Sequence, residues 1–301
     1  FMLLGCLILS NPSFAAPPTI ETFVESGVTT NGPQTSALLQ TFRLNANNPS
    51  DNLSTAYAPL TTATYTITNS VYNTATYGGF PNQPELVFGG GAATSGNEVG
   101  PAKLFQHLRS MGDATNDMFA ASIQNAVGTC SNGSACSSGT TGGIYTGVST
   151  SNAGTNSNYG VAFFILTKGI ANTPSSSRPS TSARVKVGTV KIEFNRPVSN
   201  PILQASGLGG TTATPVLGFS AEFTLTGSNV PVTMTRIAGS KELSVSGNNI
   251  TNNASTITAT SGSGGASGSV YMQGKGIQTL TFDIYVRGDG RSGGAWGTTA
   301  G

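Results

Sequence analysis

Few residues in this chain could perform nucleophilic or acid–base chemistry. The only histidine is His107, and no Gly-x-Ser-x-Gly elbow lies between a strand and a helix. Acyl transfer needs a nucleophile, a base and an orienting acid that are held together. A glycosidase needs two carboxylates across a sugar, but the carboxylates here stand in settings typical of solvent-facing strands and loops. These are Glu85, Glu98, Glu193 and Glu222. We predict that the protein is not an enzyme and has no cofactor.

One short segment could hold a metal ion. It carries three oxygen-bearing side chains within five residues, Asp113, Asn116 and Asp117. Carboxylate and amide oxygens are calcium ligands, although the segment lacks the longer ligand spacing of an EF-hand. Asp and Asn also cap helices and form turns, so the site and a purely local role both stay open. Zinc is excluded, because one histidine and one nearby cysteine pair cannot complete a zinc site.

Two of the three cysteines lie close together in the string Cys130-Ser-Asn-Gly-Ser-Ala-Cys136. In an exported protein two nearby cysteines usually pair, so we predict a disulfide between Cys130 and Cys136. Closing so short a loop contributes about 2 kcal/mol through loop entropy. The bridge would therefore fix a local loop and not the core.

The first fifteen residues resemble the second half of a signal peptide. An apolar run from Met2 to Leu9 is followed by Asn11-Pro12 and then by small residues. We place cleavage after Ala15. A lipoprotein signal with Cys6 as the lipidated residue fits less well, because the apolar run continues beyond the cysteine. We expect secretion to the cell surface, and no other segment approaches the ~20 apolar residues of a membrane helix.

The composition of the rest predicts strands and turns. Hydrophobic residues make up 37% of the chain and charged residues only 9%, with 40 glycines. Ser, Thr, Asn and Gly disfavour helix interiors, whereas Thr, Val, Ile, Tyr and Phe suit a pleated surface. The net charge of +2 comes from scattered basic residues, and nucleic-acid binding needs a clustered basic face. We therefore expect an all-β protein with no nucleic-acid partner.

Alternating apolar residues predict the elements that must position any site. From Arg184 onward strands recur about every ten residues between Gly-rich turns, which is typical of an antiparallel β-sandwich. We predict a jelly-roll-like sandwich with long polar loops, in which the apolar run Gly160–Leu166 is a central strand. The one helix is expected over residues 101–111, after Pro101 and before Gly112. Its apolar face would be formed by Leu104, Phe105, Leu108 and Met111.

These patterns divide the chain into four parts. Residues 1–15 are the signal peptide, 16–175 an N-terminal β-rich region, 185–290 a β-sandwich module, and 291–301 the start of a linker. The polar tract over 173–180 is a linker or a long loop, so the two β regions form one continuous domain or two. The sole tryptophan, Trp296, falls in the end that we expect to be poorly structured. No basic segment precedes the apolar run and no anchor follows, so we expect a fragment of a longer polypeptide.

The second half contains a segment with a family resemblance, Val190-Lys-Ile-Glu-Phe-Asn-Arg-Pro-Val-Ser-Asn-Pro-Ile-Leu-Gln-Ala-Ser-Gly-Leu-Gly-Gly210. It is followed in order by Phe223-Thr-Leu-Thr226, Leu243-Ser-Val-Ser-Gly247, Gly268-Ser-Val-Tyr-Met-Gln-Gly274 and Leu280-Thr-Phe-Asp-Ile-Tyr285. This pattern, over about residues 185–290, is similar to β-sandwich modules near the N-termini of very large bacterial surface proteins such as fibrillar adhesins. Pro197 and Pro201 cannot donate to a strand ladder, so residues 196–201 should end a strand or cross at a sheet edge.

The tripeptide Arg287-Gly288-Asp289 is one that integrins recognise in some proteins. Three-residue matches occur by chance, and this one follows a predicted strand as an ordinary turn. We expect it to have a structural role.

The resemblance implies a non-catalytic extracellular module of a bacterial surface protein that adheres to a host, matrix or glycan ligand. Sheet-face or loop Tyr, Asn, Ser and Thr side chains would bind an extracellular glycan or protein. A second hypothesis is a structural subunit or spacer of a surface filament or layer, which would contact copies of itself, with Ala16–Val24 as a donor strand. A third is a carbohydrate-binding module of a secreted enzyme, with Tyr72, Tyr77 and Tyr159 stacking on sugars.

Overall fold

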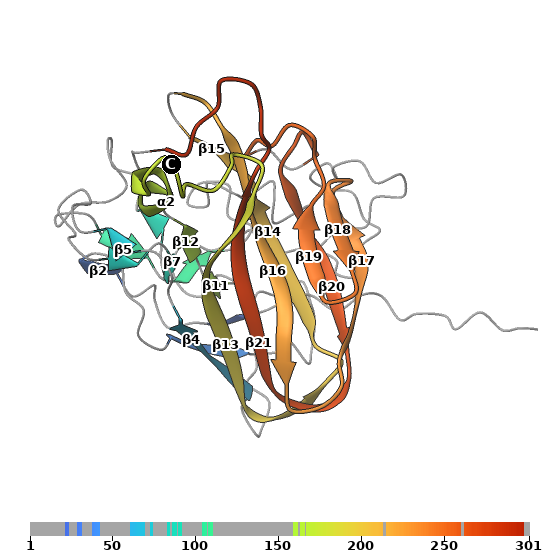
Figure 1. The fold of residues 1–301 in the computed structure, drawn as a ribbon. Coiled ribbons are helices and arrows are strands. Elements are labelled where there is room, and N and C mark those ends of the chain that lie inside the picture. The colour runs from blue at the N-terminus through green and yellow to red at the C-terminus, as the bar shows by residue number, and fades with distance from the viewer. Residues whose placement is uncertain are drawn as a thin grey trace, which may run out of the picture.

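The computed structural model of this chain describes residues 22–23, 29–31, 38–42, 61–69, 73–74, 83–84, 86–88, 90–91, 104–106, 108–110, 159–161, 163–165, 167–212, 215–259 and 262–297. These residues form antiparallel strands and one short helix, α2 (Lys168–Asn172). The strands build two main sheets that share one buried core (Figure 1). The predicted all-β, sandwich-like fold with one short helix is therefore confirmed.

The larger sheet is organised around its two longest strands, β13 (Arg184–Ser199) and β21 (Lys275–Gly288). They pair antiparallel from Arg184 opposite Arg287 to Ser199 opposite Lys275. The other strands of this sheet are β1 (Thr22–Phe23), β3 (Leu38–Phe42), β4 (Thr61–Thr68), β15 (Gly210–Thr211), β16 (Gly218–Ser228), β18 (Leu243–Ser246) and β19 (Asn249–Asn252). Their order is β1-β3-β4-β13-β21-β16-β19-β18, with β15 beside β16. In Figure 1 the long strands run side by side along the molecule.

The smaller main sheet has three strands, β14 (Ile202–Leu208), β20 (Ala266–Gln273) and β17 (Thr233–Gly239), with β20 in the middle. Val270 and Met272 of β20 are no more than 1% exposed and belong to the same buried cluster as Phe282 of β21. The ring of Phe282 meets that of Phe223 edge to face, with 6.4 Å between centroids. The core thus lies between the two sheets.

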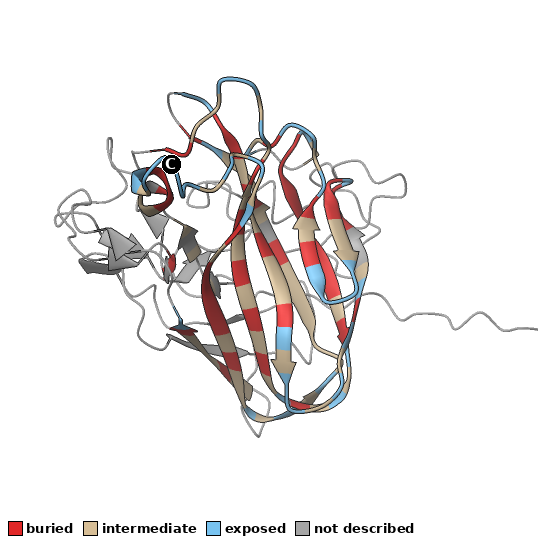
Figure 2. Ribbon diagram, in the orientation of Figure 1, coloured by how far each residue is buried: buried red, intermediate tan, exposed pale blue. Residues whose placement is uncertain are grey.

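The alternation of residue types explains which face of each strand is buried. In β21, Leu280, Phe282, Ile284 and Val286 are at most 4% exposed, while the residues between them are only partly buried. Successive side chains of a strand point to opposite faces, so one face is apolar and the other polar. Figure 2 shows this alternation along β21.

The chain passes from the large sheet to the small one at Asn200-Pro201. Asn200 adopts φ +53°, and its N–H donates to the carbonyl oxygen of Gly274 at 2.9 Å. Pro197 lies where the register of β13 on β21 is irregular, between Glu193 and Val198, so its missing N–H breaks no regular ladder. The crossing predicted for residues 196–201 is confirmed.

The N-terminal region contributes strands to the same large sheet. β4 pairs with β13 from Thr68 opposite Thr189 to Ala63 opposite Phe194, and β3 and β1 continue outward. Hydrogen bonding therefore crosses the boundary between 16–175 and 185–290.

The remaining described strands form small sheets. One has three strands, β2 (Thr29–Asn31), β9 (Leu104–Gln106) and β8 (Gly90–Gly91). The others are pairs: β5 (Asn73–Thr74) with β6 (Gln83–Pro84), β7 (Leu86–Phe88) with β12 (Phe163–Ile165), and β10 (Leu108–Ser110) with β11 (Tyr159–Val161).

The helix predicted over 101–111 is wrong. Residues 104–106 and 108–110 are the strands β9 and β10. Short apolar runs fit both helical and extended periods, and here the backbone groups pair with other strands: Phe105 lies opposite Thr30, and Leu108 opposite Val161. The run 160–166 is extended as predicted, in the strands β11 and β12, but it is not one central strand, since β11 pairs with β10 and β12 with β7 in separate two-stranded sheets.

The linker predicted to begin at residue 291 is wrong as well. Trp296 is only 4% exposed, and its Nε1 donates to the carbonyl oxygen of Pro179 at 2.9 Å. The Thr167 hydroxyl donates to the carbonyl oxygen of Gly297 at 3.4 Å. Residues up to Gly297 therefore belong to the folded unit, because the indole buries a large apolar area there.

A substitution tests this packing. Trp296→Ala should lower the free energy of unfolding by about 3–5 kcal/mol, the cost of removing a buried aromatic side chain. Ser292→Ala, at an exposed position of the same segment, should change it by less than about 0.5 kcal/mol. Urea unfolding followed by circular dichroism measures both. Equal stability of the two variants would show that the segment does not pack on the sandwich.

Candidate functional site

The metal and disulfide residues predicted from the sequence lie outside the described residues, as do the signal peptide, His107 and two of the loop tyrosines. The metal and disulfide residues are Asp113, Asn116, Asp117, Cys130 and Cys136, and the tyrosines are Tyr72 and Tyr77. Tyr159 begins β11. Within the described ranges, no three His, Cys, Asp or Glu side chains form a cluster that could hold a metal ion. No helix in this part of the chain has the length and apolarity to cross a membrane.

The outer face of the large sheet carries a row of polar residues from β4 to β18. One row of directly opposed residues runs through six strands: Thr68, Thr189, Asp283, Thr224, Asn249 and Ser246. The Thr189 hydroxyl donates to Asp283 Oδ1 at 2.8 Å, and the Thr224 hydroxyl donates to Asn249 Oδ1 at 2.7 Å. Much of the hydrogen-bonding capacity of this row is therefore used within the sheet.

The charges on this face neutralise one another. Glu222 is 1% exposed and accepts Nε of Arg184 at 2.8 Å and Nε of Arg287 at 2.7 Å, one on each oxygen. The guanidinium of Arg184 stacks over the ring of Tyr285, 3.6 Å from its centroid. Charge-assisted hydrogen bonds of this kind are strong, and a buried carboxylate requires them. This cluster holds β13, β16 and β21 together. The Arg184 guanidinium covers one side of the Tyr285 ring.

The outer face of the small sheet differs, because it has no charged side chain. Its centre is Tyr271, which is half-buried and lies directly opposite Thr235 and Ile202. We call this surface the Tyr271 face, and its residues are Ile202, Gln204, Thr233, Thr235, Ser269, Tyr271 and Gln273. Thr233, Thr235 and Gln273 are exposed. The face combines an aromatic ring with hydroxyl and amide groups.

The polar groups of the Tyr271 face are engaged to different degrees, and Ser269 is 0% exposed and belongs to its buried part. The Ser269 hydroxyl donates to Gln204 Oε1 at 2.5 Å. Among the described residues, the Tyr271 hydroxyl has no hydrogen-bond partner. Tyrosine offers an apolar body with a polar tip that normally finds a partner when it is buried. The face can therefore take up an uncharged polar ligand by stacking and hydrogen bonding.

Sequence reasoning did not single out Tyr271. Its strand was assigned only to the fold motif Gly268–Gly274. The signal was present in the alternation Ser269, Tyr271, Gln273, which places three polar residues on one face while Val270 and Met272 face the core.

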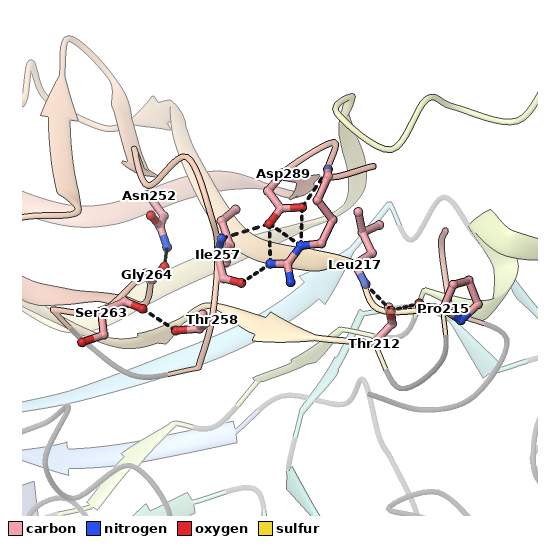
Figure 3. Close-up of polar contacts among 10 residues, drawn as sticks. Thr212, Pro215, Leu217, Asn252, Ile257, Thr258, Ser263, Gly264 and Asp289 are labelled. Carbon is pink, nitrogen blue, oxygen red and sulfur yellow. Dashed lines mark hydrogen bonds and ion pairs between the residues drawn. The ribbon is translucent and has the colours of Figure 1, made fainter. Parts of the chain in front are cut away.

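One end of the sandwich is closed by Asp289 and Arg291, which follow β21 (Figure 3). Asp289 Oδ2 accepts the N–H of Ile257 at 3.0 Å and Nε of Arg291 at 2.9 Å, and Arg291 Nη2 donates to the carbonyl oxygen of Ile257 at 2.7 Å. The Asp289 side chain is 0% exposed. These contacts fasten the loop around Ile257 to the end of the longest strand pair.

The tripeptide Arg287-Gly288-Asp289 is built into this end. Arg287 pairs with Glu222, and Asp289 is buried. A Cβ on Gly288 would lie 2.0 Å from the carbonyl oxygen of Thr181. The structure agrees with the structural role expected for these residues.

The environment of Asp289 also sets its charge state. Burial by itself would raise the pKa of this carboxyl. Hydrogen bonds from the Arg291 side chain and from the backbone N–H groups of Ile257 and Arg291, with the Arg291 charge, bring the pKa of Asp289 below its ordinary value. The ionised form therefore stabilises the fold.

Comparison with protein-family models, with curated protein sequences and with solved structures finds no match for this chain.

The lowered pKa of Asp289 predicts how stability depends on pH. A carboxyl whose pKa is lower in the folded state stabilises above its unfolded pKa of about 3.9, and this contribution is lost as the pH falls through the folded pKa. Asp289→Asn should lower the free energy of unfolding by about 2 kcal/mol at neutral pH, and the difference from wild type should shrink below about pH 4. Denaturant unfolding at a series of pH values measures this.

Glu193→Gln is the matched control. Glu193 pairs with Lys191, and their side chains are 44% and 42% exposed, so the loss of this pair should change stability by less than about 0.5 kcal/mol. A difference between Asp289→Asn and wild type that stays constant into acid would contradict the assignment.

Proposed function

We propose that this chain is a non-catalytic extracellular module of a bacterial surface protein that adheres to a ligand through the Tyr271 face. The observation that carries the proposal is the uncharged, partly unengaged set of side chains around Tyr271, on a sheet that is anchored in the core from its other side. The resemblance of residues 185–290 to modules of fibrillar adhesins supports the same role.

The chemistry of the face favours a neutral glycan over a charged ligand. Hydroxyl and amide groups both donate and accept hydrogen bonds, which matches the hydroxyls of a sugar. None of the seven residues of the face carries a charge, so a charged ligand would find no opposite charge there to pair with. A carbohydrate-binding module of a secreted enzyme would use the same face in the same way.

One observation favours the alternative of a structural subunit. β1 (Thr22–Phe23) lies within the predicted donor strand Ala16–Val24 and pairs with Thr41 and Phe42 at one edge of the large sheet. An edge strand of two residues forms few ladder hydrogen bonds, and exposed sheet edges can accept a strand from another chain. Exchange of this segment between copies would build a filament.

Binding of the purified chain to an array of neutral glycans, charged glycans and extracellular-matrix proteins tests the proposal. We expect saturable binding to a restricted set of neutral glycans. Tyr271→Ala should weaken it about tenfold or more, because an aromatic anchor contributes about 1.4 kcal/mol or more to binding. Tyr271→Phe retains the ring and should lose only the part due to the hydroxyl.

Ser246→Ala is the control, because Ser246 is exposed on the outer face of the large sheet. It should bind as wild type does. Binding that is retained in Tyr271→Ala would place the ligand on another surface. Selective binding to matrix proteins would replace the glycan with a protein ligand. No binding, together with self-assembly in light scattering, would favour the structural subunit.

A further inference from the structure

Glu242 precedes β18 and is a buried carboxylate that forms no ion pair with any residue of the described ranges. It is 4% exposed, and its Oε1 accepts the N–H of Gly264 at 3.2 Å. Its Oε2 is the one buried side-chain polar atom among the described residues that has no hydrogen-bond partner. A buried polar atom without a partner is costly, and in native proteins it commonly marks an ion or water.

The other buried carboxylates of the described part show what Glu242 lacks. Glu222 is paired with Arg184 and Arg287, and Asp289 with Arg291. Within the described ranges Glu242 belongs to no ion pair. A bound water would satisfy the hydrogen bonding of Oε2 but would leave its charge uncompensated.

The backbone around Glu242 is held in one arrangement. The amide of the buried Asn252 donates to the carbonyl oxygens of Leu208 and Gly264, both at 2.8 Å, and Figure 3 shows the contact with Gly264. The N–H of Asn253 donates to the Glu242 carbonyl oxygen at 2.9 Å. Gly264 adopts φ +110°, and a Cβ there would lie 2.4 Å from the carbonyl oxygen of Thr256. The turn that contacts the carboxylate is therefore closely packed.

Ser240, two residues before Glu242, and Gly265, next to Gly264, supply further oxygen atoms beside these residues in the chain. Ser240 is 0% exposed, and its hydroxyl donates to the carbonyl oxygen of Gly265 at 3.4 Å and accepts the N–H of Ser267 at 3.3 Å. Carboxylate, carbonyl and hydroxyl oxygens are the ligands that hard cations take, and calcium accepts backbone carbonyls and waters beside a carboxylate.

We propose that Glu242 binds a hard cation of the calcium class, which compensates the buried charge and fixes the turn 262–265 onto β18 and β19. The site differs from the one predicted at Asp113, Asn116 and Asp117. It also does not depend on what the Tyr271 face binds.

Thermal unfolding of the full chain in about 2 mM calcium chloride and in chelator tests the proposal, since a ligand that binds only the native state raises its melting temperature. The wild type should melt about 2–6 °C higher with calcium. Glu242→Gln, which removes the charge and keeps the shape, should melt at the same temperature in both. The double variant Asp113→Asn, Asp117→Asn should keep the rise, because it leaves Glu242 intact.

Two results would overturn the site. One is a calcium effect that persists in Glu242→Gln and disappears in the double variant. The other is no calcium effect on the melting temperature of the wild type, which would mean that no cation compensates the buried carboxylate. If Glu242→Gln does not fold, calcium titration calorimetry of the double variant decides, since one bound calcium per chain supports the site and no heat of binding overturns it.

Discussion

The antiparallel pairing of β13 with β21 is the constraint on which the rest of this structure depends. These strands carry β4 on one side and β16 on the other, so the large sheet is assembled outward from them. Their register also decides which residues meet the core. A slip of one residue would turn Phe282 and Ile284 outward and bring Asp283 and Tyr285 inward. The same register brings Arg184 and Arg287 onto Glu222, so the apolar and the charged side of the sheet are specified together.

The two outer faces differ in how their polar groups are used within the sandwich. On the large sheet, arginine, lysine and carboxylate groups meet partners from neighbouring strands, and such groups have little capacity left for a ligand. On the small sheet, Tyr271 and its neighbours carry no charge and use few of their hydrogen-bonding groups internally. The paired charges of the sandwich thus lie on the large sheet, and the uncharged Tyr271 face lies on the small one.

The sequence predicted the sandwich because a half-buried strand repeats every two residues, and from Arg184 to Val286 this repeat is clear. It failed at 101–111, where a few apolar residues fit a helix as well as two strands and where distant partners such as Thr30 and Val161 decided the outcome. It failed at Trp296 because Gly-rich composition suggests a tail, whereas the pocket comes from residues more than a hundred positions earlier, near Pro179. The burial of Glu242 likewise depends on the turn 262–265, and no local sequence pattern predicts that this turn packs against Glu242. The predicted calcium and disulfide residues, Asp113 to Cys136, lie outside the described part.

The closeness of Thr167 and Gly297 has a mechanical consequence. The Thr167 hydroxyl donates to the Gly297 carbonyl oxygen, and Thr167 directly precedes α2. The strands that follow Thr167 and precede Gly297 are β13 and β21, and they begin and end where Arg184 lies opposite Arg287. Tension that enters at 167 and leaves at 297 therefore pulls β13 and β21 apart from one end, so that their hydrogen bonds break in succession and not all at once. The first contacts to break under such a force are the hydrogen bond of the Trp296 indole to Pro179 and that of the Asp289 carboxylate to Ile257, so these contacts provide the initial resistance. A small number of side chains at one end thus sets the force at which this unit begins to extend.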